Sequence, residues 1–430
     1  MKNYFLLILL LIIATSCQIS EKPIVSVAFV DSLVTNNLPS KNMKIMEGNL
    51  SFWQNKIEES PDYFVNTPQY AGALASRFQI FGDIEDLRKA DSLMQLSNKA
   101  NQGQEPSILR SLASFAMQQH QFIRADSLQK KAMKIDTKNV GNVFFDFDVS
   151  FERGNILRAE GLLKQLKTVK TYGYFFRKSK MEHYSGSLDS AIVYMEKAIE
   201  KADNNKNLRQ IALSNTADLY IHKGEMARAN QLFMESLRID AADFHSIMGL
   251  GWIALVHDKN DALATKIFQF VRKKQHSPDA IFKLMQVAEA KKDSLLQKKY
   301  AQEFVQMTTK PAYGQMYNKY LIDIFTGILN TPQKAVLLAE KEIESRPTPQ
   351  VYAWYVYALF CNKEIEKAYQ IYQKKVSEQP LEALELYYMG KMMQGMKKNY
   401  NAQQFFEAAY QNKYDLSPKK VADLDKILGE

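Results

Sequence analysis

The residue types that usually carry catalysis or bind metal ions are scattered along this 430-residue chain. The six histidines are His120, His183, His222, His245, His257 and His276. None of them lies in an HxxxH or HExxH spacing, which would place two ligands on one helix face. Asp146 and Asp148 are two residues apart, so on a helix their carboxylates point in different directions. We expect no enzyme active site, no resident metal ion and no cofactor.

One glycine motif has the outline of a phosphate-binding loop. Gly249 and Gly251, with Ala254, match the pattern GxGxxA. In dinucleotide-binding proteins that loop follows a β-strand and precedes an acidic residue by about 20 positions. Here the preceding residues have a helical pattern, so we interpret the glycines as small residues at a helix-packing position.

The elements that would position any site are best seen in residues 210–244. This stretch reads as two short amphipathic helices that meet at a Lys-Gly pair. Its small and aromatic positions are Ala217, Tyr220, Gly224, Ala229 and Phe233. The spacings of three and four place these side chains on one face of each helix, and the glycine suits the tight turn between them.

The same pattern recurs along the chain at an almost constant interval. The alanines that mark the second helix of each unit are Ala90, Ala125, Ala159, Ala191, Ala229, Ala264, Ala301, Ala335, Ala368 and Ala402. Their successive spacings are 35, 34, 32, 38, 35, 37, 34, 33 and 34 residues. We interpret these alanines as packing positions where a second helix approaches closely.

This repeat resembles the tetratricopeptide repeat (TPR), a helix–turn–helix unit with a period of 34 residues. Leu213 and Ala241 depart from the family pattern, which has Trp and Pro there. The resemblance implies an all-α protein, a right-handed α-α superhelical solenoid of about ten TPR-like repeats. We expect the repeats to occupy 42–416 and a C-terminal capping helix to occupy 417–430.

The N-terminus has the pattern of an export signal. Lys2 precedes an apolar run over 4–13, and Cys17 follows a short segment of small residues. The pattern resembles the signal of bacterial lipoproteins, which implies a signal peptide over 1–16 and a lipidated Cys17. We expect a tether over 17–41 and attachment to the outer membrane of a bacterium of the Bacteroidetes type. The alternative is a plain secreted protein.

Composition narrows the possible partners. The net charge is +9, but export argues against nucleic acid as the partner. Apolar residues make up 46% of the chain, which is enough for a large core. Besides Cys17 the only cysteine is Cys361, so a lipidated monomer would have no disulfide and would rely on packing alone.

The residues most suited to bind a partner should lie on the first helix of each unit, because these helices line the concave groove of a TPR solenoid. The candidate groove-lining residues are Phe144, Phe151, Phe176, Lys180, Ser214, Asp218, Ile221 and Trp354. The leading hypothesis is a membrane-anchored, non-catalytic scaffold that binds a protein segment or an envelope complex. The alternative is a SusD-like glycan-binding lipoprotein that partners an outer-membrane transporter.

Overall fold

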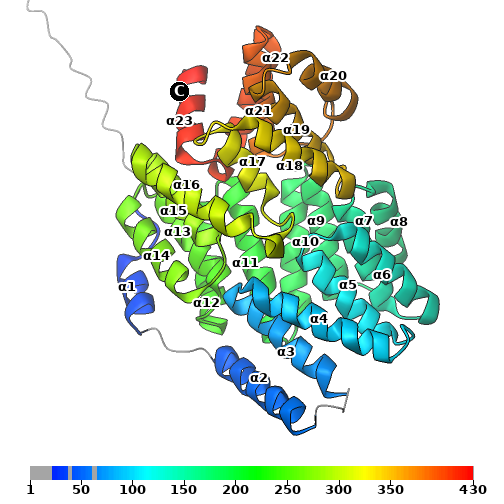
Figure 1. The fold of residues 1–430 in the computed structure, drawn as a ribbon. Coiled ribbons are helices and arrows are strands. Elements are labelled where there is room, and N and C mark those ends of the chain that lie inside the picture. Colours follow the sequence, from blue (N-terminus) through cyan, green and yellow to red (C-terminus); the bar gives the residue numbers. More distant parts are fainter. Residues whose placement is uncertain (1–21, 37–40, 61–64, 430) are drawn as a thin grey trace, which may run out of the picture.

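The computed structural model describes residues 22–36, 41–60 and 65–429. In this structure, ten antiparallel helix pairs form the body of the protein (Figure 1). The first helices of the pairs are α3 (Asn66–Phe81), α5 (Pro106–Gln118), α7 (Val140–Glu152), α9 (Tyr172–Tyr184), α11 (Lys206–Lys223), α13 (Phe244–Val256), α15 (Asp279–Ala290), α17 (Asn318–Thr326), α19 (Pro349–Cys361) and α21 (Ala383–Gly395). The second helices are α4 (Ile84–Ala100), α6 (Phe122–Ile135), α8 (Ile156–Leu166), α10 (Leu188–Lys201), α12 (Met226–Ile239), α14 (Asp261–Lys274), α16 (Ser294–Thr308), α18 (Pro332–Ser345), α20 (Ile365–Lys375) and α22 (Asn399–Gln411). The described residues contain no strand. The predicted all-α, TPR-like solenoid is therefore confirmed.

Three further helices flank the ten pairs. They are α1 (Val27–Asn36), α2 (Lys41–Glu59) and α23 (Pro418–Leu428), the last in the region predicted to cap the array. Two short 3₁₀ turns, η1 (Pro311–Tyr313) and η2 (Lys413–Asp415), lie in connecting segments. None of the helices in the described part of the chain is long and apolar enough to cross a bilayer.

All ten marker alanines lie on second helices and are buried. Their register is not uniform, however. In eight repeats the marker is the fourth residue of its helix, as Ala229 is in α12. In α4 and α16 that position is held by Leu87 and Gln297, and the markers Ala90 and Ala301 lie one turn later on the same buried face. Counted from the fourth helix residue, the intervals from Leu87 to Ala125 and from Gln297 to Ala335 are both 38 residues, so the shifted alanines conceal two longer repeats.

The turns inside the pairs share one backbone conformation. In the eight repeats with the regular register, the residue five positions before the marker has a positive φ. These residues are Gly154, Gly186, Gly224, His120, Lys259, Asn330, Lys363 and Lys397. Glycine adopts this left-handed conformation without a steric penalty, whereas a lysine pays one. The turn geometry therefore comes from the helix pairing, and glycine is not required for it.

The segment expected to be a tether over 17–41 contains a docked helix, which corrects that expectation for its described half. Helix α1 contacts α14, and Val25 and Val30 are buried in the core formed by repeats five to seven. The Asp258 carboxylate accepts hydrogen bonds from the backbone N–H groups of Ile24 and Val25, each at 2.9 Å. Cys17 and residues 18–21 lie outside the described residues.

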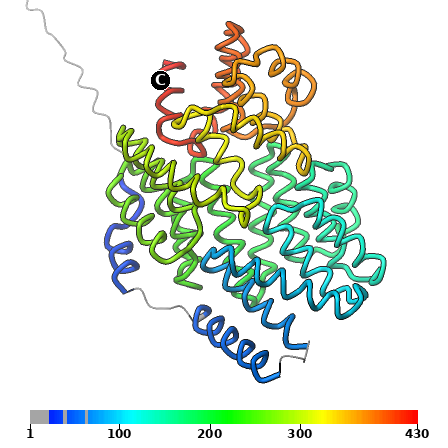
Figure 2. The backbone as a smooth tube through the Cα atoms, in the orientation of Figure 1, coloured from blue at the N-terminus to red at the C-terminus, as the bar shows by residue number. Residues whose placement is uncertain are grey.

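The array curves until parts that are far apart in sequence meet (Figure 2). Near its start, the backbone carbonyls of Ile80 and Phe81 accept hydrogen bonds at 2.7 Å from Gln275 and His276, between α14 and α15. Near its end, the indole N–H of Trp252 donates to the Tyr414 carbonyl at 2.8 Å. The concave face is consequently divided into cavities that are partly open to solvent.

Candidate binding cavity

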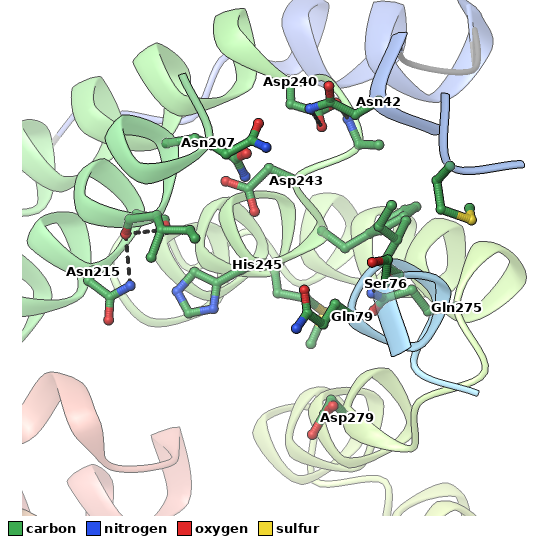
Figure 3. A pocket seen from close by; sticks show the side chains of 18 of the residues that line it. Asn42, Ser76, Gln79, Asn207, Asn215, Asp240, Asp243, His245, Gln275 and Asp279 are labelled. Atoms are coloured by element: carbon green, nitrogen blue, oxygen red, sulfur yellow. Dashed lines mark hydrogen bonds between the residues drawn. The ribbon is translucent and has the colours of Figure 1, made fainter. Parts of the chain in front are cut away.

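The larger cavity has a volume of about 1130 Å³ and lies between α2, α3, α11 and α13, with α15 closing one side (Figure 3). Each helix contributes side chains at helical spacing. On α11 they include Ser214, Asp218 and Ile221, and on α13 they include His245 and Trp252. The spacing places one face of each helix toward the cavity while the opposite face packs in the core.

The three α11 residues proposed from the sequence line this cavity, but they offer it different groups. The Ser214 hydroxyl is committed to the Ile211 carbonyl at 3.1 Å, and Ile221 is 6% exposed. The Asp218 carboxylate is the charged member of the three, and it pairs with Nε2 of His245 at 2.7 Å.

Side-chain amides are the most frequent polar groups on the cavity lining. Three of them have partners: Asn42 donates to Asp240, Asn215 to the Ile211 carbonyl and Gln275 to the Ile80 carbonyl. Five others have no side-chain hydrogen bond to another described residue; they are Asn49, Gln69, Gln79, Asn207 and Gln210. Each offers a donor and an acceptor to a ligand.

Two cations lie in this cavity. Burial lowers the pKa of His245, but the Asp218 carboxylate and its hydrogen bond outweigh this and raise the pKa to about 9. Burial lowers the pKa of Lys283 to about 8, and its Nζ lies 3.4 Å from the centre of the Trp252 ring. A cation over an aromatic face is stabilised without a carboxylate partner.

The smaller cavity, of about 480 Å³, adjoins the larger one, and Asp279 and Tyr320 line both. Burial raises the pKa of Asp279, against the hydrogen bonds donated by the Ser277 and Tyr317 hydroxyls. The carboxyl group therefore stands at the boundary between two chambers, half shielded from bulk solvent.

Three more residues proposed from the sequence, Phe151, Lys180 and Trp354, line the smaller cavity. Lys180 pairs with Glu152 at 2.7 Å, and the Trp354 indole donates to Glu385 at 2.6 Å. Unlike the five unpaired amides of the larger cavity, the Lys180 and Trp354 side chains already have partners within the protein.

Lys319 is a second lysine on the lining of the smaller cavity. Its Nζ lies 3.3 Å from Glu382 and 3.6 Å from the fully buried Glu385. Lys319 lowers the pKa of Glu382 to about 2, and burial raises the pKa of Glu385. These ion pairs connect α17 with the start of α21 and stabilise one side of the smaller cavity.

Phe144 and Phe176, which the sequence also suggested as groove-lining, are not among the lining residues of the two cavities. The Arg177 guanidinium lies 4.8 Å from the Phe144 ring and donates to the Phe144 carbonyl. Phe176 stacks on Tyr172 with ring centres 5.7 Å apart. Both rings pack between neighbouring helices, because aromatic runs on these helices cover more than one face.

Sequence reasoning missed the contributions of α2, α3 and α15 to the site. Asn49 and Gln79 reach the cavity only because the start of the array lies against repeat six, whereas Lys283 lies on α15, in the repeat next to α13. Single polar residues at these positions carry no spacing signal that would separate them from solvated surface residues. Within the described ranges, no group of three or more His, Cys, Asp or Glu side chains is placed to hold a metal ion.

Neither a protein-family model nor a curated protein sequence matches the chain. Among solved structures, PilW, a type IV pilus biogenesis factor, aligns at 14% identity and a TM-score of 0.38, covering 49% of this chain and 97% of its own. A tetratricopeptide repeat protein from Parabacteroides merdae aligns at 12% identity and 0.35, covering 60% and 99%. Yeast Tom70 aligns at 12% and 0.35, covering 84% and 96%. At these values the similarities identify no shared ligand, and the chain is described by its own geometry as a TPR-like helical solenoid.

Proposed function

We propose that this chain is a non-catalytic scaffold that holds an extended peptide segment of a protein partner in the larger cavity. The supporting observation is the set of five side-chain amides without an internal partner on the cavity lining. Each peptide unit presents one N–H donor and one carbonyl acceptor, and a side-chain amide can pair with both at once.

The size and apolar lining of the cavity fit the same ligand. Its volume of about 1130 Å³ is above the roughly 300–1,000 Å³ typical of small-molecule pockets. Trp53, which is half-buried, adds apolar surface for a side chain of the bound segment, and Phe244 and Trp252 are buried in the cavity wall. The proposed partner segment is therefore extended, with its backbone on the amides and an apolar side chain between the aromatic rings.

We further propose that lipidation of Cys17 anchors the protein to a bacterial outer membrane, where the partner belongs to an envelope complex. The support is the sequence pattern around Cys17, which lies outside the described residues. Mass spectrometry of the N-terminal peptide tests the anchor: an acyl mass on Cys17 is expected, and an unmodified cysteine in membrane-extracted protein contradicts it.

Site-specific photocrosslinking tests the peptide site. A crosslinking residue is placed at Gln79 or Asn207 in the cavity, and as a control at Gln165 or Gln373, which are exposed on second helices. We expect one partner protein to crosslink from the cavity positions alone. A synthetic peptide of the crosslinked segment should compete, and Gln79→Ala with Asn207→Ala should weaken its affinity about tenfold or more, because two backbone pairings are lost.

Two results contradict this proposal. Equal crosslinking from cavity and control positions would place the partner elsewhere. Saturable binding of a glycan in calorimetry, lost in the Gln79→Ala/Asn207→Ala variant and accompanied by no crosslinked protein, would favour the glycan-binding alternative.

A further inference from the structure

The start of the described chain is held against the turn between α13 and α14. The Asp258 side chain is 1% exposed, and besides the two backbone N–H groups of Ile24 and Val25 it contacts Nδ1 of His257 at 2.8 Å. A buried carboxylate that accepts several hydrogen bonds is costly to release. The position of Ile24 on the body is therefore fixed at this turn.

This attachment limits how far an anchor on Cys17 can be from the body. Cys17 and Ile24 are seven positions apart in the sequence, and an extended chain spans at most about 3.6 Å per residue, or about 25 Å in all. The inference that follows rests on the proposed lipid anchor. With the anchor present, the edge of the solenoid that contains the α13–α14 turn faces the membrane.

The next turn along this edge is strongly basic. Helices α13 and α15 are first helices of consecutive repeats and contact each other, so their C-terminal ends share one edge. Lys291 and Lys292 lie in the turn after α15, and Lys298 and Lys299 lie on the first half of α16. All four are exposed, and none has a carboxylate within 4 Å among the described residues.

An exposed leucine lies among these lysines. Leu295, the second residue of α16, is 84% exposed, the highest value of any large apolar side chain in the described part of the chain. Lys298 and Lys299 follow it at the spacings that share a helix face. The acidic residues of this turn form other contacts and do not pair with the lysines. Glu289 accepts a hydrogen bond from Gln297, and Asp293 accepts one from the backbone N–H of Leu296 at the start of α16.

We propose that this basic edge, defined by Lys291, Lys292, Leu295, Lys298 and Lys299, lies against a bilayer that contains anionic lipid. Lysines near a negatively charged lipid surface are attracted to it, and an apolar side chain among them can enter the headgroup region. In this proposal the lipid on Cys17 attaches the protein to the membrane, and the basic edge sets the orientation of the solenoid on it. The larger cavity is thereby held in a fixed direction relative to the membrane.

A fluorophore at position 295 tests this orientation in the full chain. The acylated protein carries Cys361→Ala and has no free thiol at Cys17, so a polarity-sensitive thiol probe labels only Leu295→Cys. The labelled protein is reconstituted into phosphatidylcholine vesicles with or without phosphatidylglycerol. The matched control is Leu157→Cys, because Leu157 is also the second residue of its helix and is 83% exposed. We expect a blue-shifted emission for position 295 in anionic vesicles and no shift for position 157.

A charge variant separates orientation from attachment. Lys291, Lys292, Lys298 and Lys299 are changed to Gln, and the control variant changes Lys167, Lys170, Lys201 and Lys206, which are likewise exposed. The first set should abolish the blue shift and the control set should preserve it. Vesicle-bound, acylated protein with no shift at position 295 would overturn the inference while leaving the anchor intact. Protein that carries no acyl group and does not float with the vesicles would overturn the anchor and the inference together.

Discussion

A lysine in a left-handed turn is the clearest sign that helix pairing dictates the local backbone in this molecule. Lys363 has a φ of 68°, at the position that Gly224 holds with a φ of 82° in repeat five. Side chains adopt this conformation at a cost of roughly 1 kcal/mol, which glycine avoids. The chain therefore carries small, removable strain in several of its turns.

Lys363→Gly should stabilise the protein by about 0.5–1 kcal/mol, because it removes the Cβ strain at a positive φ. The measurement is the midpoint of urea unfolding. Lys131→Gly is the control, since Lys131 is an exposed residue inside α6, and there glycine should destabilise by about 1 kcal/mol. A loss of stability in both variants would contradict the role assigned to the turn.

The His245–Asp218 pair should make stability depend on pH. The pKa of His245 is raised to about 9, above the ordinary value of about 6.5. The stabilisation is therefore complete below about pH 6.5 and is lost as the pH rises through about 9.

Thermal melting between pH 6.5 and 9.5 measures this dependence. We expect Asp218→Asn to flatten the profile and to lower the pKa of His245 in a titration followed by NMR. Asp31→Asn removes an exposed pair with Lys266 and should leave the profile unchanged. An unchanged His245 pKa in Asp218→Asn would show that the pair does not set it.

At the scale of elements, the docked N-terminal helix is the least expected feature. Helix α1 is only ten residues long and buries a single residue, Val30, so its sequence shows no sustained period. What holds it is the Asp258 carboxylate, 234 positions away from Ile24. A short helix held by contacts with residues more than 200 positions away leaves no signal that spacing could reveal.

Asp258→Ala should release α1 from the body. Loss of two backbone hydrogen bonds to a buried carboxylate should lower the local opening free energy by about 3 kcal/mol. Hydrogen exchange of the amides in residues 24–36 measures it. Lys266→Ala, which removes only the exposed pair with Asp31, should change exchange by less than about 1 kcal/mol. Similar protection from hydrogen exchange in both variants would show that the Asp258 carboxylate does not hold α1 on the body.

The helix pairs themselves could be predicted well from the sequence. Each second helix packs closely against its neighbours at one position, which requires a small residue, and this leaves an alanine at nearly regular intervals. The candidate site could be predicted only in part. Ser214, Asp218 and Ile221 share one face of α11 and line one cavity, whereas Phe151, Lys180 and Trp354 line another. Periodicity shows which face of a helix is inward, but it does not show which distant helix stands opposite.

On the scale of the whole molecule, closure of the array decides its shape. Contacts between repeats one and six, and between repeat six and the C-terminal segment, hold the solenoid in a compact form. The compact form predicts a radius of gyration of about 22 Å for a chain of this length. The repeat period alone predicts only that neighbouring units stack.

Removing the C-terminal segment should open the array. A chain that ends at Gln411 lacks the contacts of Tyr414 with Trp252, of Asp415 with His222 and of Lys420 with Asp323. Small-angle X-ray scattering should therefore give it a larger radius of gyration than the intact protein, despite its lower mass. A chain that ends at Leu428 keeps these contacts and is the control. Equal radii for the two would contradict the role of the segment.

Closure also fixes how many units the protein can contain. In an open solenoid each repeat contacts only its neighbours, so units can be added or deleted with little effect elsewhere. Here the carbonyls of Ile80 and Phe81 must meet Gln275 and His276, which requires five repeats of defined curvature between them. With one repeat more or fewer, the carbonyls of Ile80 and Phe81 would no longer lie opposite Gln275 and His276, and these hydrogen bonds would be lost. The contact between the start of the array and repeat six therefore constrains the number of repeats between them.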